Sequence, residues 1–277
     1  MKSLTLKEIQ HAELENLLHL KEICEEQGFT YYLAYGTLLG AVRGHGFIPW
    51  DDDTDIWMPR KDYTNFSKYC ADNKDTLLPF KLCNRGNTAD YPYGISRLAN
   101  QNYKYLVTNK YENQFELGVF TDIYPLDNFG TDSNVLQMKN LSKRIGKENE
   151  KYLKYCSSSY SPNLIKAKLK KIRYYVLHTF HSNNYGKKID NKILKLISES
   201  TSCNDQYIGE VCWDNNVFYR YKKEYFKESI SINFEGYEFN APIGYDKILK
   251  ITYGDYMKLP PESERHPYHG YKILKKE

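Results

Sequence analysis

The chain has 277 residues, with 39 Lys and Arg against 35 Asp and Glu, and a net charge of +4 at pH 7. This length provides for one large domain with an enclosed site, and the basic excess suits anionic ligands but is too small for a dedicated nucleic-acid binder. Six cysteines lie far apart at no metal-binding spacing, and no apolar run approaches the roughly 20 residues of a membrane-spanning helix. We therefore expect a cytoplasmic protein with reduced thiols.

Hydrophobic patterning and turn residues predict alternating helices and strands in the first half of the chain. In chain order we expect a helix over 6–27 capped by Gly28, a strand over 29–36, a turn at Gly36 and Thr37, a short helix to Gly44, a loop over 45–50, a strand over 53–58, a helix over 59–73, and strands over 80–84, 93–99 and 117–126. Residues 133–203 are Lys-rich, Tyr-rich and helical in pattern, and residues 204–277 return to short mixed elements. The pattern predicts an α/β fold.

Four aspartates crowd into the segment "WDDDTDIW", at positions 51, 52, 53 and 55. Period-two alternation places Asp53 and Asp55 side by side on one face of the strand. Such a pair can coordinate one hard cation, whereas without a cation the crowded carboxylates would repel one another and raise their own pKa values. The alternative is a solvated loop at Asp51 and Asp52 followed by an exposed strand face, but the apolar flanks argue against it.

A third acid would complete a metal shell or act as general base for an acceptor hydroxyl. Asp122 fits this role because it is the lone acid among the apolar neighbours of "GVFTDIYPL". Asp127, which follows a proline, is expected in a turn.

Basic and turn residues near the acids are candidates for binding a phosphorylated donor. The turn at Gly36 and Thr37 opens a helix whose free N–H groups can hold a phosphate. Arg43 and His45 follow that helix and could neutralise a donor, although Arg43 could equally pair with the acidic loop. Arg97 lies on a predicted strand, where it needs either a phosphate or an internal carboxylate as partner.

Further aromatic and basic residues stand out along the chain. Trp50 could stack on a base or on a quaternary ammonium group, and core packing is the alternative for it or for Trp57. Arg265, His266 and His269 form a basic cluster near the end of the chain. The basic helical segment around 164–180 could rest on an anionic membrane surface, with a solvated charged face as the alternative.

Three separated blocks, "YGTLLGAVRGHGFIPWDDDTDIWMPRKDY", "GVFTDIYPLDNF" and "YGDYMKLPPESERHPYHG", resemble the LicD family in the same order. The resemblance implies a nucleotidyltransferase fold like the palm of DNA polymerase beta, with a mixed sheet core formed by about 1–132 and 204–277 in a single catalytic domain. Residues 133–203 would then be a helical insertion. It further implies transfer of a phospho-alcohol, typically phosphocholine, from CDP-choline or another CDP-alcohol to a glycan hydroxyl, with release of CMP.

Carried onto this sequence, the resemblance makes Asp53, Asp55 and Asp122 the catalytic acids and ligands of Mg²⁺ or Mn²⁺, with Asp51 assisting. Gly36 and Thr37 would touch the donor phosphates, and the basic cluster of residues 265–269 would face substrate. The fukutin-related pattern carries a zinc-binding cysteine cluster that this chain lacks, so we predict no zinc. A glycan acceptor, free or lipid-linked, would be met in the cytoplasm or at the inner face of the membrane.

Four alternatives stay open at this stage. The transferred group could be phosphoethanolamine, glycerol phosphate or ribitol phosphate instead of phosphocholine. A true nucleotidyltransferase would release pyrophosphate, and a glycosyltransferase would use the same acids to hold a nucleotide-sugar. A catalytically dead glycan-binding module would keep the tyrosine-rich surface without needing three intact acids.

Overall fold

The computed structural model describes residues 2–106, 115, 117–156, 164–180, 184–212, 218–267 and 272–276. Its helices are α1 (Leu6–Gln27), α2 (Tyr35–Gly44), α3 (Arg60–Asp72), α4 (Val135–Cys156), α5 (Leu164–Phe180), α6 (Tyr185–Ser200) and α7 (Tyr245–Tyr253), with short 3₁₀ turns at Asp132–Asn134, Lys223–Phe226 and Glu262–Glu264. Its strands are β1 (Lys2–Ser3), β2 (Tyr32–Leu33), β3 (Thr54–Pro59), β4 (Phe80–Cys83), β5 (Ser96–Asn100), β6 (Tyr103–Leu106), β7 (Val119–Asn128), β8 (Tyr207–Gly209), β9 (Tyr221–Lys222), β10 (Ser229–Phe234), β11 (Tyr237–Pro242) and β12 (Lys272–Lys275).

The main sheet is mixed, which confirms the predicted α/β class. Its strands run in the order β2-β3-β7-β5-β4, with β8 on the end of β7 and β9 beyond it. Strands β3 and β7 are parallel, whereas β2, β5 and β8 pair antiparallel with their neighbours. Two smaller sheets, β1-β12-β6 and the hairpin β10-β11, flank this centre.

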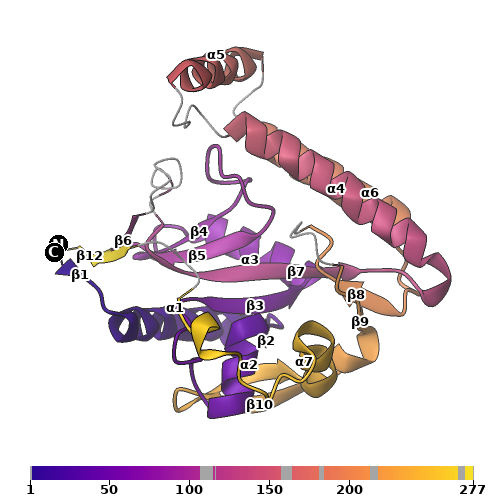
Figure 1. Ribbon diagram of the computed structural model, residues 1–277. Coiled ribbons are helices and arrows are strands. Elements are labelled where there is room, and N and C mark those ends of the chain that lie inside the picture. The colour runs from indigo at the N-terminus through magenta and orange to yellow at the C-terminus, as the bar shows by residue number, and fades with distance from the viewer. Residues whose placement is uncertain are drawn as a thin grey trace.

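Helices α1 and α3 cover one face of the main sheet. Asn16 of α1 donates to the backbone oxygen of Leu98 at 2.7 Å and to Thr121 Oγ1 at 2.8 Å, and the hydroxyls of Tyr63 on α3 and Ser96 are 2.7 Å apart. The opposite face of β3, β5 and β7 lies toward α2, α7 and the C-terminal segment (Figure 1). Because side chains alternate along a strand, residues one step away from Leu98 and Thr121 point to that second face.

Most predicted elements are confirmed, with small shifts at their ends. Helix α1 ends at Gly28 in the left-handed conformation, as its cap predicts. Helix α2, however, begins at Tyr35, so Gly36 and Thr37 lie inside its first turn. The earlier start follows from Ala34, whose extended backbone caps the helix and whose carbonyl accepts the first helical hydrogen bond, from Leu38, at 2.9 Å.

Three helices, α4, α5 and α6, lie consecutively between residues 135 and 200. Figure 1 shows α4 and α6 packed together along one side of the molecule, with α5 beyond the end of this pair. Among the described residues, none of the helices has the length and apolar character needed to cross a bilayer.

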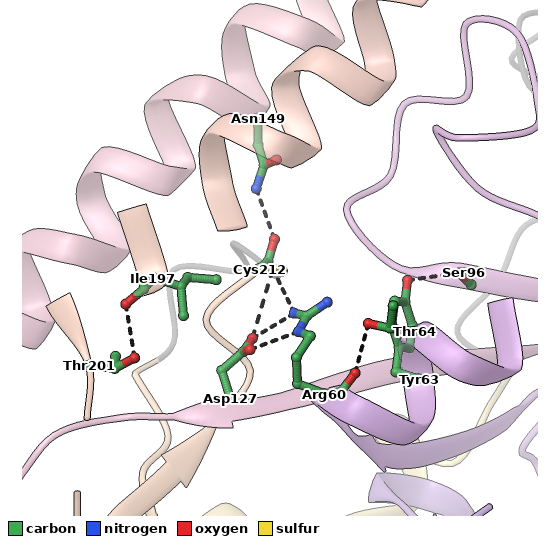
Figure 2. A network of polar contacts seen from close by, with 9 residues as sticks. All are labelled: Arg60, Tyr63, Thr64, Ser96, Asp127, Asn149, Ile197, Thr201 and Cys212. Carbon is green, nitrogen blue, oxygen red and sulfur yellow. Dashed lines mark hydrogen bonds and ion pairs between the residues drawn. The ribbon is translucent and has the colours of Figure 1, made fainter. Parts of the chain in front are cut away.

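A partly buried arginine joins the sheet to α4 (Figure 2). Arg60 donates through Nε and Nη2 to the two carboxylate oxygens of Asp127, at 2.7 and 2.6 Å, and its Nη2 lies 3.0 Å from Cys212 Sγ. Asn149 of α4 donates to the backbone oxygen of Cys212 at 2.9 Å. The expectation of a turn at Asp127 is therefore wrong: this residue belongs to β7, where Arg60 compensates its buried charge.

Candidate active site

A cavity of about 870 Å³ opens on the second face of the sheet. Its wall combines elements that are far apart in the sequence: the start of α2, the loop before β3, strands β3, β5 and β7, and the segment after α7. The lining residues are Tyr35, Gly36, Leu39, Arg43, Ile48, Trp50, Asp51, Asp53, Asp55, Arg97, Asp122, Tyr124, Tyr253, Asp255, Tyr256, Lys258, Leu259, Pro260, Pro261 and Glu264.

The predicted acids meet in this cavity. Asp55 and Asp122 are register partners on the parallel strands β3 and β7, and each is only 8% exposed. Asp53 precedes β3 and Asp51 lies in the loop before it, and both line the same wall. Residues about 70 positions apart in the sequence are thus placed side by side by strand pairing.

The surroundings of Asp55 oppose its ionisation. Burial raises the pKa of Asp55 well above its usual value, and the nearby negative charges of Asp53, Asp122 and Asp51 raise it further. The backbone N–H of Asp55 donates to Thr37 Oγ1 at 2.9 Å, which fixes the strand at this point. The site therefore concentrates negative charge that a bound cation would offset.

Carboxylate oxygens are the ligands that Mg²⁺ and Mn²⁺ prefer, so the residues of this wall fit a divalent cation. Among the described residues, the acids whose ligand atoms all lie within 4.8 Å of one another are Asp51, Asp52 and Asp53. This group includes Asp52, which the sequence analysis left out of the ligand set and which is itself buried. Asp53 belongs both to this group and to the predicted triad.

Arg97 pairs with the third acid rather than standing alone. Its Nε donates to Asp122 Oδ1 at 2.6 Å, and its Nη2 lies 3.4 Å from Oδ2. The guanidinium also lies 4.2 Å from the ring centroids of Tyr93 and Phe120. Its buried Nη1 has no hydrogen-bond partner among the described residues, which leaves one donor in the cavity wall for an anionic ligand.

Arg43 holds the C-terminal segment against α2. Its Nε donates to the backbone oxygen of Tyr256 at 2.5 Å and its Nη2 to that of Lys258 at 2.9 Å. Because Tyr256 and Lys258 belong to the cavity lining, Arg43 holds this part of the wall against α2.

The small residues of α2 explain how closely the helix approaches the acids. A Cβ atom built on Gly36 would lie 2.5 Å from Asp51 Oδ2, so only glycine leaves room for this carboxylate. Thr37 is 2% exposed and lies beneath the wall, with its hydroxyl on the Asp55 backbone. His45, at the C-cap of α2, is exposed and outside the cavity lining.

The candidate substrate contacts divide between the cavity and its rim. Trp50 lines the cavity, and the guanidinium of Arg265 lies 5.8 Å from its ring centroid. Trp57 is instead a core residue, with its ring 5.1 Å from that of Tyr35. His266 is exposed and is not part of the lining. The predicted contact at position 269 lies outside the described residues.

Two glutamates beside the site escaped the sequence analysis. Glu13 of α1 accepts from the Thr54 hydroxyl at 2.8 Å and from the Phe120 N–H at 3.3 Å, and burial raises its pKa well above the usual value. Burial also raises the pKa of Glu210 to about 7, although hydrogen bonds from Tyr35 and the Trp57 indole oppose the shift. Glu13 falls on the apolar stripe of α1, a signal that could have identified it.

Comparisons with known proteins bear on the same region. The family model described as LicD/FKTN/FKRP, nucleotidyltransferase domain, matches residues 28–140. The chain is 29% identical over 280 residues to the lipopolysaccharide cholinephosphotransferase LicD of Haemophilus influenzae, with 97% of each protein covered. An uncharacterised protein of Rickettsia prowazekii is 29% identical over 108 residues, 39% of this chain and 36% of that protein. The family match contains Asp51, Asp53, Asp55 and Asp122 of the cavity wall.

Proposed function

Because the chain belongs to the LicD family, we propose that it is a transferase that moves phosphocholine from CDP-choline to a hydroxyl of a cell-surface glycan and releases CMP. The observation that carries the proposal is the cavity in which Asp51, Asp53, Asp55 and Asp122 face a buried arginine. The Haemophilus influenzae relative, a cholinephosphotransferase of lipopolysaccharide by its name, supports the choice of transferred group and acceptor.

We also propose that β3, β5, β7 and α2 form a nucleotidyltransferase core. The D-x-D strand lies parallel to the strand of the third acid, and the helix that precedes it meets the same cavity. Helices α4, α5 and α6 then form an insertion at about residues 133–203, in a single catalytic domain of 1–277 whose core is formed by about 1–132 and 204–277.

The aspartates would hold Mg²⁺ or Mn²⁺, with Asp53 and Asp55 as the principal ligands, and Asp51, Asp122 and the neighbouring Asp52 available to complete the set. The cation, when bound, would neutralise the donor phosphates and the charge that develops on the leaving group. Asp122 is already hydrogen-bonded by Arg97, which fixes its oxygens in place. This contact favours a role for Asp122 as a metal ligand over a role as general base, the two roles that the sequence left open.

Arg97 binds and orients the donor in this proposal. Its Nη1 donates to a phosphate oxygen of CDP-choline while Nε and Nη2 remain on Asp122. The acceptor hydroxyl attacks the β-phosphorus, the bond from that phosphorus to the bridging oxygen breaks, and CMP leaves. The proton of the hydroxyl passes to a carboxylate oxygen of the cavity. One phosphocholine group is thereby joined to the glycan for each CMP released.

The cavity wall favours choline over uncharged alcohols as the transferred headgroup. Aromatic faces bind quaternary ammonium groups, and the lining includes Trp50, Tyr35, Tyr124, Tyr253 and Tyr256. A glycerol or ribitol group would gain less from these rings.

Product analysis tests this function. Purified protein is incubated with Mg²⁺, a lipopolysaccharide acceptor and, in turn, CDP-choline, CDP-ethanolamine, CDP-glycerol, CDP-ribitol or UDP-glucose, and released nucleotides are separated by chromatography. We expect CMP from CDP-choline, dependent on acceptor and abolished in Asp55→Asn. Faster turnover of CDP-glycerol or CDP-ribitol would change the transferred group, and release of UDP from UDP-glucose would indicate a glycosyltransferase. A separate incubation with CTP, assayed for pyrophosphate, tests the nucleotidyltransferase alternative, which pyrophosphate release would support.

A further inference from the structure

Helix α5 presents an aliphatic stripe to solvent. Ile165, Leu169, Ile172 and Val176 recur at helical spacing and are 74%, 62%, 53% and 48% exposed. Large apolar side chains exposed singly are ordinary, but four on one helix face form a continuous patch. Figure 1 shows that α5 lies at the edge of the molecule, beyond the α4–α6 pair.

The opposite side of α5 is anchored to the body of the protein. Tyr174 donates its hydroxyl to Asp90 Oδ2 at 2.8 Å, and His178 Nε2 lies 3.1 Å from Asp90 Oδ1. The His178 ring stacks on Tyr155 of α4 with centroids 4.1 Å apart. Since Tyr174 and His178 lie about half a turn around the helix from the stripe, docking through them fixes the aliphatic side chains outward.

The charge of α5 is of one sign. The segment 164–180 contains the basic residues Lys166, Lys168, Lys170, Lys171 and Arg173 and no Asp or Glu. The neighbouring helices α4 and α6 carry both signs and form surface ion pairs such as Lys154–Glu150 and Lys195–Glu199. At 100° per residue, Lys166 falls on one side of the aliphatic stripe and Lys168 on the other. Arg173, on the same side as Lys166, donates through Nη2 to the backbone oxygen of Lys154 on α4 and adds to the anchoring of the helix.

We propose that α5 lies on an anionic lipid bilayer, with its aliphatic stripe in the headgroup boundary and the flanking Lys166 and Lys168 on the lipid phosphates. Apolar side chains flanked by Lys and Arg are the arrangement of interfacial helices. A second copy of this chain fits the surface less well, because a two-fold contact through the stripe would bring the flanking Lys166 and Lys168 of the two copies together. The inference is independent of the reaction proposed for the cavity.

Vesicle flotation of the full chain tests this inference. We expect wild type to float with vesicles of phosphatidylcholine and phosphatidylglycerol, and not with phosphatidylcholine alone, and to dissociate at high salt. Lys166→Gln with Lys168→Gln should weaken the partition coefficient by roughly thirtyfold. Leu169→Glu with Ile172→Glu should abolish flotation, because it places charge inside the apolar stripe.

Matched controls come from the neighbouring helices. Lys187→Gln with Lys188→Gln on α6, and Leu136→Glu on α4, change equally exposed positions and should leave flotation unchanged. Circular dichroism confirms that each variant is folded. Absence of wild-type binding, or equal weakening by the control variants, would overturn the proposal. Sedimentation that shows a concentration-dependent dimer, broken by the Leu169 and Ile172 changes without any vesicle binding, would overturn it in favour of self-association.

Discussion

Strand β7 carries two buried aspartates, each in an ion pair with an arginine, and the two pairs look alike but have different surroundings. Asp122 pairs with Arg97 and Asp127 pairs with Arg60, each through Nε and Nη2. The first pair lines a cavity whose wall also includes Asp51, Asp53, Asp55 and Asp255. The second borders a cavity of about 670 Å³ in which Asp127 is the acidic residue of the lining.

The difference teaches that an excess of acidic residues in one cavity wall, rather than an ion pair, marks the candidate catalytic centre. At Asp127 one arginine balances one carboxylate, and the contacts with Cys212 and α4 close the network (Figure 2). At Asp122 one arginine stands among Asp51, Asp53 and Asp55. Holding these charges together costs stability unless a cation is present, so the first pair is the one whose loss should affect turnover.

Removal of the acids should give the largest effect. We expect Asp55→Asn and Asp122→Asn to lower kcat by roughly a thousandfold or more, because cation binding and charge stabilisation are lost together. Asp127→Asn is the matched variant: it should lower the free energy of unfolding by about 3 kcal/mol, since it strands Arg60, while the folded fraction keeps its kcat. Kinetics and urea unfolding of the three proteins measure both quantities. Equal kcat losses in all three would remove the distinction between the two pairs.

Replacement of each arginine by lysine sharpens the comparison between the two ion pairs. Lysine cannot reproduce the two-point contact of a guanidinium, so Arg97→Lys and Arg60→Lys should each cost about 2 kcal/mol of unfolding free energy. Arg97→Lys should in addition lower kcat/KM for the CDP-linked donor by about a hundredfold, since the Nη1 donor is lost. Steady-state kinetics at saturating acceptor measure this. An Arg97→Lys protein with unaltered kcat/KM would contradict its role in donor binding.

Filling the space beside the backbone of α2 should have a smaller effect on activity. Gly36→Ala places a methyl group 2.5 Å from Asp51 Oδ2, so the carboxylate must move. We expect about a tenfold rise in the Mg²⁺ concentration needed for half-maximal activity, because one metal ligand, Asp51, would no longer be held in position. Gly44→Ala, at the end of the same helix with no atom within 4 Å of the added Cβ, should leave this concentration unchanged. Identical metal dependence in both variants would show that Asp51 takes no part.

The smallest expected effect concerns stability and pH. Burial raises the pKa of Glu210 from 4.5 to about 7, so this carboxyl stays protonated in the folded protein at pH values where it ionises in the unfolded chain. Its contribution to stability is complete below pH 4.5 and is lost as the pH rises to about 7. The free energy of unfolding of wild type should therefore decrease across this pH window, and Glu210→Gln should reduce that decrease by at most roughly 3 kcal/mol.

Urea unfolding at pH 5 and pH 7.5 measures the Glu210 effect. Glu199→Gln, at an exposed position of α6, is the control and should follow wild type. A Glu210→Gln curve parallel to wild type at both pH values would contradict the burial of an ionisable carboxyl behind the cavity.

Local pattern was sufficient to predict the elements that position the site. Strand β3, helix α3 and strand β7 follow from runs of β-branched, aromatic and periodic apolar residues, and the convergence of Asp53, Asp55 and Asp122 was predicted through the family resemblance. The pairing of Arg97 with an internal carboxylate was one of two open alternatives. The register of β5 against β7, which places Arg97 opposite Asp122, depends on contacts between segments far apart and is not encoded in any short window.

The remaining site residues needed tertiary structure. Glu210 lies in an irregular stretch after β8 and meets Tyr35 and Trp57 only when the chain has folded. Arg43 reaches backbone carbonyls more than 200 residues later, which no side-chain pattern can signal. Asp127 was misassigned because the preceding proline suggested a turn, whereas the Arg60 contact stabilises it inside a strand.

Calorimetric titration of CDP-choline, with and without Mg²⁺, into wild type and Asp55→Asn tests the central claim most directly. We expect wild type to bind CDP-choline only when Mg²⁺ is present, and Asp55→Asn to lose this dependence together with most of the affinity while remaining folded by circular dichroism. Binding that is equally tight in both proteins, or independent of Mg²⁺ in wild type, would contradict the assignment of the acidic cavity as a cation-dependent donor site.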